Sequence, residues 1–135
     1  MCKLGDIIVV NNYKGEDGKE IGRHSFVVID DESGTIAGLE YSFVASVISS
    51  FKNDAIKKKK LSYEGNIELP IDSMIGEKFK KDSYVKVDQA FFFEKNKIDY
   101  YVLGSLNKDY LSKLVKIIIN LANQGKLKRI VENLK

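Results

Sequence analysis

The chain has 135 residues, of which 44% are hydrophobic and 30% charged, and this composition predicts one folded domain over residues 1–135 rather than a disordered or collagen-like chain. Its net charge of +3 is too small to indicate a nucleic-acid-binding protein by itself. One cysteine and one histidine exclude an internal disulfide bond and a Cys/His zinc site, and because the acidic residues are scattered we expect no metal and no other cofactor.

The first half of the chain has the pattern of β structure. Residues 7–10 and 25–29 are β-branched, apolar runs that we expect to form two paired strands. The charged, glycine-containing segment 13–22 between them predicts a loop. A short apolar segment at 35–39 then precedes a further strand over 43–48.

The second half begins with a lysine-rich segment and then returns to strand patterns. Apolar and polar residues alternate over 61–70, which predicts another strand or hairpin, and they alternate again over 84–88. Aromatic runs at 91–93 and 100–103 flank the polar residues 94–97, as the two strands of a hairpin would. We expect these aromatic residues to pack the core, with stacking on nucleic-acid bases as the alternative.

Near residue 106 the period of the apolar residues changes. Leucine, valine and isoleucine recur at spacings of three and four from 111 to 122, which predicts an amphipathic helix with Asn107 as its N-cap and Gly125 as its C-cap. A short second helical segment is expected over 127–134. The whole pattern indicates a mainly β protein of the α+β class, a small antiparallel barrel or sandwich with a C-terminal helix.

Arg23 and His24 are the first candidate functional residues, because a charged, glycine-containing loop runs into a strand at this point. An arginine offers a fixed fork of donors to phosphate oxygens, and a histidine with an ordinary pKa of about 6.5 can exchange protons near neutral pH. A surface arginine beside a turn histidine would give the same sequence, so both interpretations stay open.

A second group of candidates follows the strand over 43–48. Ser49 and Ser50 supply two hydroxyls, and Lys52 supplies an ammonium group, so together they can hold one phosphate. The basic run formed by Lys57, Lys58, Lys59 and Lys60 is a candidate RNA-binding surface. The alternative is that the two serines and Lys52 belong to an ordinary loop and that the four lysines form a solvated face.

Five short segments, taken in order, carry a family resemblance. They are residues 5–10, Gly22-Arg23, Ser49-Ser50, residues 83–89 and residues 103–106, the last leading into the C-terminal helix. In this order they resemble the MazF/PemK-like family of toxin endoribonucleases over about 120 residues. The resemblance implies a MazF-like, SH3-like barrel and a toxin–antitoxin function.

Two departures from the family pattern point to one branch of it. The family usually has proline where this chain has His24, and the segment between Ser50 and Ser83 is long and lysine-rich. Both features look more like the toxins of type III toxin–antitoxin systems, the ToxN/CptN-like branch. Residues 49–52 are also similar to the hydroxyl, hydroxyl, any residue, lysine motif of that branch.

The resemblance implies metal-independent cleavage of single-stranded RNA. The 2′-hydroxyl of the substrate attacks the adjacent phosphate, which gives a 2′,3′-cyclic phosphate and a 5′-hydroxyl end. On this reading Arg23 and Lys52 stabilise the charge on the phosphate, Ser49 and Ser50 orient its oxygens, and His24 transfers a proton.

The two branches imply different partners. A MazF-type toxin is a homodimer bound by a disordered protein antitoxin, whereas a type III toxin alternates with its antitoxin RNA in a closed ring. The basic run favours an oligomeric complex with an antitoxin RNA, because inhibitor and substrate can then share one basic groove. A small protein antitoxin is the alternative.

Two other functions fit the same composition. A non-catalytic RNA-binding module would use the same basic and aromatic residues, and a CcdB-like gyrase poison would share the fold without needing residues 49–52. We expect a cytoplasmic protein without a membrane partner, because no apolar stretch approaches the roughly 20 residues of a membrane span and the amino terminus lacks the apolar core of a signal peptide.

Overall fold

The computed structural model describes residues 2–31, 40–76, 79 and 81–135. Within these residues the chain forms one sheet in the order β4-β6-β3-β2-β1-β8-β5, with β7 added beside β3 and β9 beside β7. The strands are β1 (Asp6–Lys14), β2 (Glu20–Asp30), β3 (Phe43–Ser50), β4 (Asn66–Leu69), β5 (Met74–Ile75), β6 (Ser83–Lys86), β7 (Gln89–Phe93), β8 (Asp99–Leu106) and β9 (Lys128–Ile130). The apolar segment expected at 35–39 lies outside the described residues.

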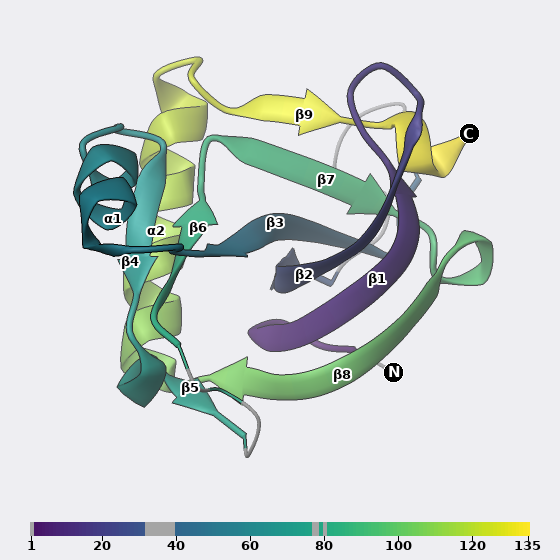
Figure 1. Ribbon diagram of the computed structural model, residues 1–135. Helices are drawn as coiled ribbons and strands as arrows, with labels where there is room; N and C mark the ends of the chain where they lie inside the picture. The colour runs from purple at the N-terminus through teal and green to yellow at the C-terminus, as the bar shows by residue number, and fades with distance from the viewer. Residues whose placement is uncertain (1, 32–39, 77–78, 80) are drawn as a thin grey trace.

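Two α-helices accompany the sheet, α1 (Asp54–Leu61) and α2 (Lys108–Asn123), together with the 3₁₀ turns η1 (Ile71–Ser73), η2 (Lys95–Lys97) and η3 (Glu132–Leu134). All strand pairs are antiparallel except β7 with β9. The expected fold class, mainly β with a C-terminal helix, is therefore confirmed. In Figure 1 the sheet curves from β8 through β1 and β3 to β6 and β4, and α2 lies at the β4–β6 end.

The expected pairing of the first two strands is confirmed, but the loop between them is shorter than the predicted 13–22. β1 runs to Lys14 and β2 begins at Glu20, because the pairing resumes at Tyr13 and Gly22 beyond a bulge. Asn12 in the bulge has a φ of 53° and Gly22 a φ of 99°. A left-handed backbone at these two positions absorbs the extra residues without ending the ladder.

The predicted hairpin of residues 91–93 with 100–103 is wrong. β7 pairs with β3, where Phe43 lies opposite Phe93, and β8 pairs with β1. Phe91, Phe92 and Phe93 are all buried, so both faces of β7 are covered by other parts of the protein. Both edges of β7 are also paired, one with β3 and the other with β9. The expectation that these aromatic residues pack the core is confirmed.

The helix expected from residue 106 is confirmed as α2. The Asn107 side chain accepts a hydrogen bond from the Tyr110 N–H at 2.8 Å, and Leu114, Ile118 and Leu121 are the buried positions. Gly125 has a φ of 71°, and the N–H of Lys126 returns to the Leu121 carbonyl at 2.8 Å, as in a Schellman C-cap.

One expected helical segment is wrong, and one helix of the structure was not predicted from the sequence. The segment 127–134 is not one helical segment, because residues 128–130 form β9 and only residues 132–134 form a 3₁₀ turn, η3. The lysine-rich segment forms α1, whose N-cap Asn53 accepts from the Ile56 N–H at 2.9 Å. No residue of α1 is buried, so capping and the basic last turn, rather than an apolar face, stabilise this helix.

The sheet separates two main groups of core residues. One face carries a cluster that includes Phe26, Val28 and Phe93, and the opposite face carries Ile7, Val27 and Ile48 with the apolar side of α2. Because residues alternate between the faces of a strand, neighbours in β2 and β3 belong to different clusters. This alternation decides how the candidate functional residues are arranged.

Candidate functional site

The ends of β2 and β3 bring Arg23 and Ser50 to the same face of the sheet. Ser25 lies directly opposite Ile48 in the antiparallel register, so Arg23 is level with Ser50 two residues further along each strand. Ser50 in turn lies opposite Ser83 of β6. The side chains of directly opposite residues share a face, so the sheet places these hydroxyls and the guanidinium group on one side.

Arg23 is exposed at the end of this face and is held by Tyr101 of β8. Its Nη2 donates a hydrogen bond to the Tyr101 hydroxyl, and its Cζ lies 5.4 Å from the centre of the Tyr101 ring. Arg23, His24, Ser25 and Tyr101 line a pocket of about 480 Å³ together with apolar residues of β1 and β8. The guanidinium group thus contacts Tyr101 at a pocket large enough for a ligand.

Ser50 lines an adjoining cavity of about 300 Å³. Ser25, Ser83 and Lys81 also line it, and Ser25 and Leu103 belong to both this cavity and the Arg23 pocket. We call the two adjoining hollows the serine groove. It combines a guanidinium group, an ammonium group and the hydroxyls of three serines and Tyr101, and such groups are the donors that hold phosphate oxygens in proteins.

His24 points to the other face of the sheet, although it also contributes to the rim of the Arg23 pocket. Its ring centre lies 6.2 Å from that of Tyr13 and 6.3 Å from that of Phe26, which belongs to the buried cluster of that face. Burial, and secondarily the nearby charge of Lys86, lowers the pKa of His24 below its ordinary value. The imidazole is therefore neutral at pH 7.

The tautomer of His24 follows from its hydrogen bond. The N–H of Ser25 donates to Nδ1 of His24 at 3.0 Å. Because Nδ1 accepts a bond, the single proton of the neutral ring is on Nε2. In this arrangement His24 can donate a hydrogen bond through Nε2 but cannot take up a proton at that atom.

Ser49 lies on the opposite face from Ser50. It is paired with Tyr84, whose ring stacks on that of Phe51 with the centres 5.0 Å apart and the planes at 28°. The two adjacent serines expected to act together are thus separated by the strand, and Ser50 is the one that lines the serine groove.

The lysines expected to bind RNA differ in their contacts. Lys57 forms ion pairs with Glu68 at 3.4 Å and Asp82 at 3.7 Å, and its Nζ lies 5.6 Å from the centre of the Phe51 ring. Lys58 and Lys59 are exposed, whereas Lys60 is half-buried. Lys52 is exposed just beyond the end of β3. Lys57 is therefore the member of the run already neutralised by carboxylates.

Sequence reasoning about chemistry did not select Tyr101, Lys81 or Ser25. Tyr101 lies opposite Val9 in the pairing of β8 with β1, so the alternation of side chains along β8 could have placed it on the same face as Val9. Nothing local signals Lys81, because it reaches the serine groove only through the fold of the segment before β6. These residues are found from strand pairing rather than from any motif.

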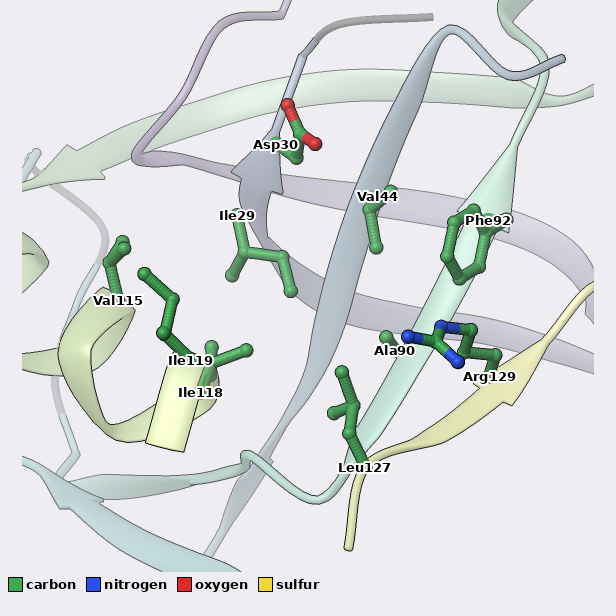
Figure 2. A pocket seen from close by; sticks show the side chains of 10 residues that line it. All are labelled: Ile29, Asp30, Val44, Ala90, Phe92, Val115, Ile118, Ile119, Leu127 and Arg129. Carbon is green, nitrogen blue, oxygen red and sulfur yellow. The ribbon is translucent and has the colours of Figure 1, made fainter. Parts of the chain in front are cut away.

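A different pocket, of about 320 Å³, lies between α2 and the strands (Figure 2). In Figure 2 Ile118 of α2 points toward Leu127, and Val44 and Ala90 lie on the neighbouring strands. Asp30 and Arg129 are the charged residues that line it, and they come from separate strands. This pocket is largely apolar and lacks the hydroxyl cluster of the serine groove, so we do not place the chemistry there.

The described part of the chain contains neither a metal-binding cluster nor a membrane-spanning helix. No group of three or more His, Cys, Asp or Glu side chains among these residues is arranged to hold a metal ion. Neither helix that the structure describes has the length and apolar character required to cross a membrane.

Comparison with known proteins identifies the family. A search of curated proteins finds no match. The family model of the PemK-like, MazF-like toxins of type II toxin–antitoxin systems matches residues 3–121, which include every residue of the serine groove. The type III branch expected from the sequence gains no support from this match and is not excluded by it. The chain belongs to the PemK-like, MazF-like toxin family.

Proposed function

We propose that this protein is a toxin that cleaves single-stranded RNA in the serine groove without a metal ion. Toxins of the family are typically endoribonucleases, which supports the reaction class. The observation that carries the proposal is the register of β2 and β3, which sets Arg23 level with Ser50 on one face of the sheet. Arg23 and Ser50 bind the scissile phosphate, and Ser25 lies on the same face, two residues from Arg23 along β2.

The reaction uses the nucleophile of the substrate. The 2′-oxygen of one ribose forms a bond to phosphorus, the bond from phosphorus to the 5′-oxygen of the next nucleotide breaks, and a cyclic phosphate remains. The 2′-hydroxyl loses its proton and the departing 5′-oxygen gains one. Negative charge builds up on the non-bridging oxygens, where fixed donors such as the Arg23 fork and the Ser50 hydroxyl are most effective.

Arg23 is prepared for this role by its contacts. The Tyr101 hydroxyl and ring hold the guanidinium group in one orientation before substrate binds. A preorganised charge stabilises a transition state without the cost of reordering solvent or side chains. Lys52, exposed two residues beyond Ser50, adds positive charge for the RNA backbone.

We assign no direct catalytic role to His24 or Ser49. The His24 ring packs beside Tyr13 and Phe26, and its Nδ1 already accepts the Ser25 N–H. Ser49 lies opposite Tyr84 on the face away from the serine groove. The set of five residues expected from the sequence is thereby narrowed to Arg23, Ser50 and Lys52.

The antitoxin is proposed to be a protein, because the family that matches is that of type II systems. The second candidate is an antitoxin RNA, favoured by the exposed Lys58 and Lys59 of α1. The two candidates are distinguished by purifying the toxin together with whatever the adjacent stretch of its genome expresses. A small acidic protein bound to the toxin supports the first candidate, and a short repeated RNA supports the second.

The activity is tested on purified protein with single-stranded RNA in the presence of EDTA. End-group analysis should show 2′,3′-cyclic phosphate and 5′-hydroxyl ends. RNA that is bound tightly but stays intact would identify a binding module instead. Toxicity with intact RNA and broken DNA would identify a gyrase poison, and either result overturns the proposal.

A further inference from the structure

The cavity at the Ser50 end of the serine groove has the two kinds of surface that an unpaired nucleotide needs. Its volume of about 300 Å³ is at the lower end of the range typical of small-molecule sites, about 300–1,000 Å³. Ile7, Ile48 and Leu103 form apolar parts of its lining, whereas three serines and a lysine form the polar part. The Arg23 pocket adjoins it through Ser25 and Leu103.

The polar groups of this cavity are available to a ligand. Ser50 and Ser83 lie opposite each other, so their β-carbons are about 4.5–5.5 Å apart and both hydroxyls can reach one acceptor group. The Ser83 hydroxyl makes one long hydrogen bond, at 3.4 Å, to the Lys81 carbonyl. Lys81 is exposed and forms no ion pair with any residue that the structure describes. It differs in this from Lys57, which is paired with two carboxylates.

The aromatic residue that lines the cavity is Phe79, whose side chain is half-buried. A β-carbon placed on Gly104 would lie 2.8 Å from Cε2 of Phe79, and one placed on Gly76 would lie 2.7 Å from the same atom. The ring therefore rests directly against the backbone at two glycines. Such close packing restricts its rotation and presents a fixed aromatic surface to the cavity.

We propose that this cavity binds one nucleotide of the RNA next to the scissile phosphate. Its base lies against Phe79, the hydroxyls of Ser25 and Ser83 bind polar atoms of the base, and Lys81 binds the following phosphate. Unpaired RNA bases are recognised by stacking on aromatic rings together with hydrogen bonds to their edges. The inference rests on the proposed function, which sets the phosphate between Arg23 and Ser50, and it locates the sequence preference of the enzyme at one neighbouring position.

The test uses a short 2′-O-methyl RNA, which lacks the attacking hydroxyl and stays intact during the measurement. A series of these oligonucleotides carries one abasic residue at successive positions, and fluorescence anisotropy gives each dissociation constant. In the wild type we expect one position at which loss of the base weakens binding by about 5- to 150-fold. In the Phe79→Ala protein the same abasic residue should have no further effect.

Phe51→Ala is the matched control. Phe51 is also half-buried, but its ring stacks on Tyr84 on the opposite face of the sheet. For the Phe51→Ala protein, the dissociation constants measured along the series of abasic oligonucleotides should show the same sensitive position as those of the wild type. A Phe79→Ala profile that keeps the sensitive position, or a wild-type profile without one, overturns the nucleotide site. Failure of RNA cleavage in EDTA overturns the proposed function instead, so the two failures are distinguishable.

Lys81→Ala provides a second measurement that is independent of the packing of Phe79. Because Lys81 is exposed, its removal should not unfold the protein. The log–log slope of affinity against salt concentration should decrease in size by about 0.7, the value of one phosphate contact on a single strand. Lys116→Ala, on the exposed side of α2, should leave the slope unchanged. Equal slopes for wild type and Lys81→Ala contradict the phosphate contact.

Discussion

Near the Arg23 end of β2 and the Ser50 end of β3, the two faces of the sheet differ in chemistry. The side chains on the two faces nevertheless come from residues that are adjacent in the sequence. On one face Arg23 and Ser50 border a groove with further hydroxyls and a lysine. On the other face His24 lies beside aromatic rings, and Ser49 faces Tyr84. One face can bind an anion, whereas the other is largely a packing surface.

This difference shows that sequence neighbours in a strand are poor functional partners. Arg23-His24 and Ser49-Ser50 each look like a pair in the sequence, but the side chains of each pair lie on opposite faces. The pairing that matters is across the strands, from Arg23 to Ser50. Substitutions confined to one face therefore test whether the two faces differ in function.

The largest effect is expected for Arg23→Gln. Loss of the guanidinium charge should lower kcat by about 10²–10³-fold, the usual effect of removing one transition-state donor. Arg129→Gln is the matched control, because Arg129 is the other arginine of the chain and lines the apolar pocket instead. Single-turnover cleavage of RNA measures both. Equal activity of Arg23→Gln and Arg129→Gln would remove Arg23 from the site.

The next effect separates the adjacent serines. Ser50→Ala should lower kcat by about 10- to 150-fold, because a hydrogen bond to a charged group contributes about 1.5–3 kcal/mol. Ser49→Ala should stay within about twofold of the wild type, as expected of a substitution away from the reacting groups. The same cleavage assay ranks the two variants. A larger loss for Ser49→Ala would reverse the assignment of the faces.

The spacing of apolar residues within one segment predicted the helices and strands that bury one apolar face. The spacing of Leu114, Ile118 and Leu121 placed α2, and the β-branched run at 7–10 placed β1. The pairing of β7 with β3 and β9 could not be read in this way, because it joins segments far apart in the sequence. The short apolar segment 127–134 fits a helix or a strand by composition, and only its pairing with β7 decides.

The same limit applies to the site. Residue type and position suggested Arg23 and Ser50, since a phosphate site needs such donors. Lys81 has no local signal, and Tyr101 is placed beside Arg23 only by the pairing of β8 with β1 and of β1 with β2. The separation of Ser49 from Ser50 follows because β3 continues to Ser50, two residues beyond the strand expected over 43–48.

A smaller effect is expected for Tyr101→Phe, which keeps the ring beneath Arg23 but removes the hydroxyl. Loss of one hydrogen bond of about 0.5–1.5 kcal/mol should lower kcat by about 2- to 12-fold, with KM little changed. In the Arg23→Gln background the same substitution should have no further effect, because the two side chains act as a unit. Tyr63→Phe, an exposed tyrosine after α1, is the control. Additive effects in the double variant would show that Tyr101 acts independently of Arg23.

The smallest effect concerns the packed face and is one of stability. The pKa of His24 is lowered in the folded protein, chiefly by burial, so below about pH 6.5 the unfolded chain binds more protons than the folded one. The free energy of unfolding should therefore fall as the pH is lowered from about 7.5 to about 5.5. In His24→Gln, which cannot titrate, this part of the fall should be absent.

Urea denaturation at the two pH values measures the effect, and cleavage rates at the same pH values provide the comparison between the faces. If His24 belongs only to the packed face, His24→Gln changes the pH dependence of stability and leaves the pH dependence of kcat as in the wild type. A kcat profile that loses a titration in His24→Gln would show that the imidazole exchanges a proton during cleavage. In that case residues on both faces of β2 would take part in the reaction: Arg23 on the face of the serine groove and His24 on the opposite face.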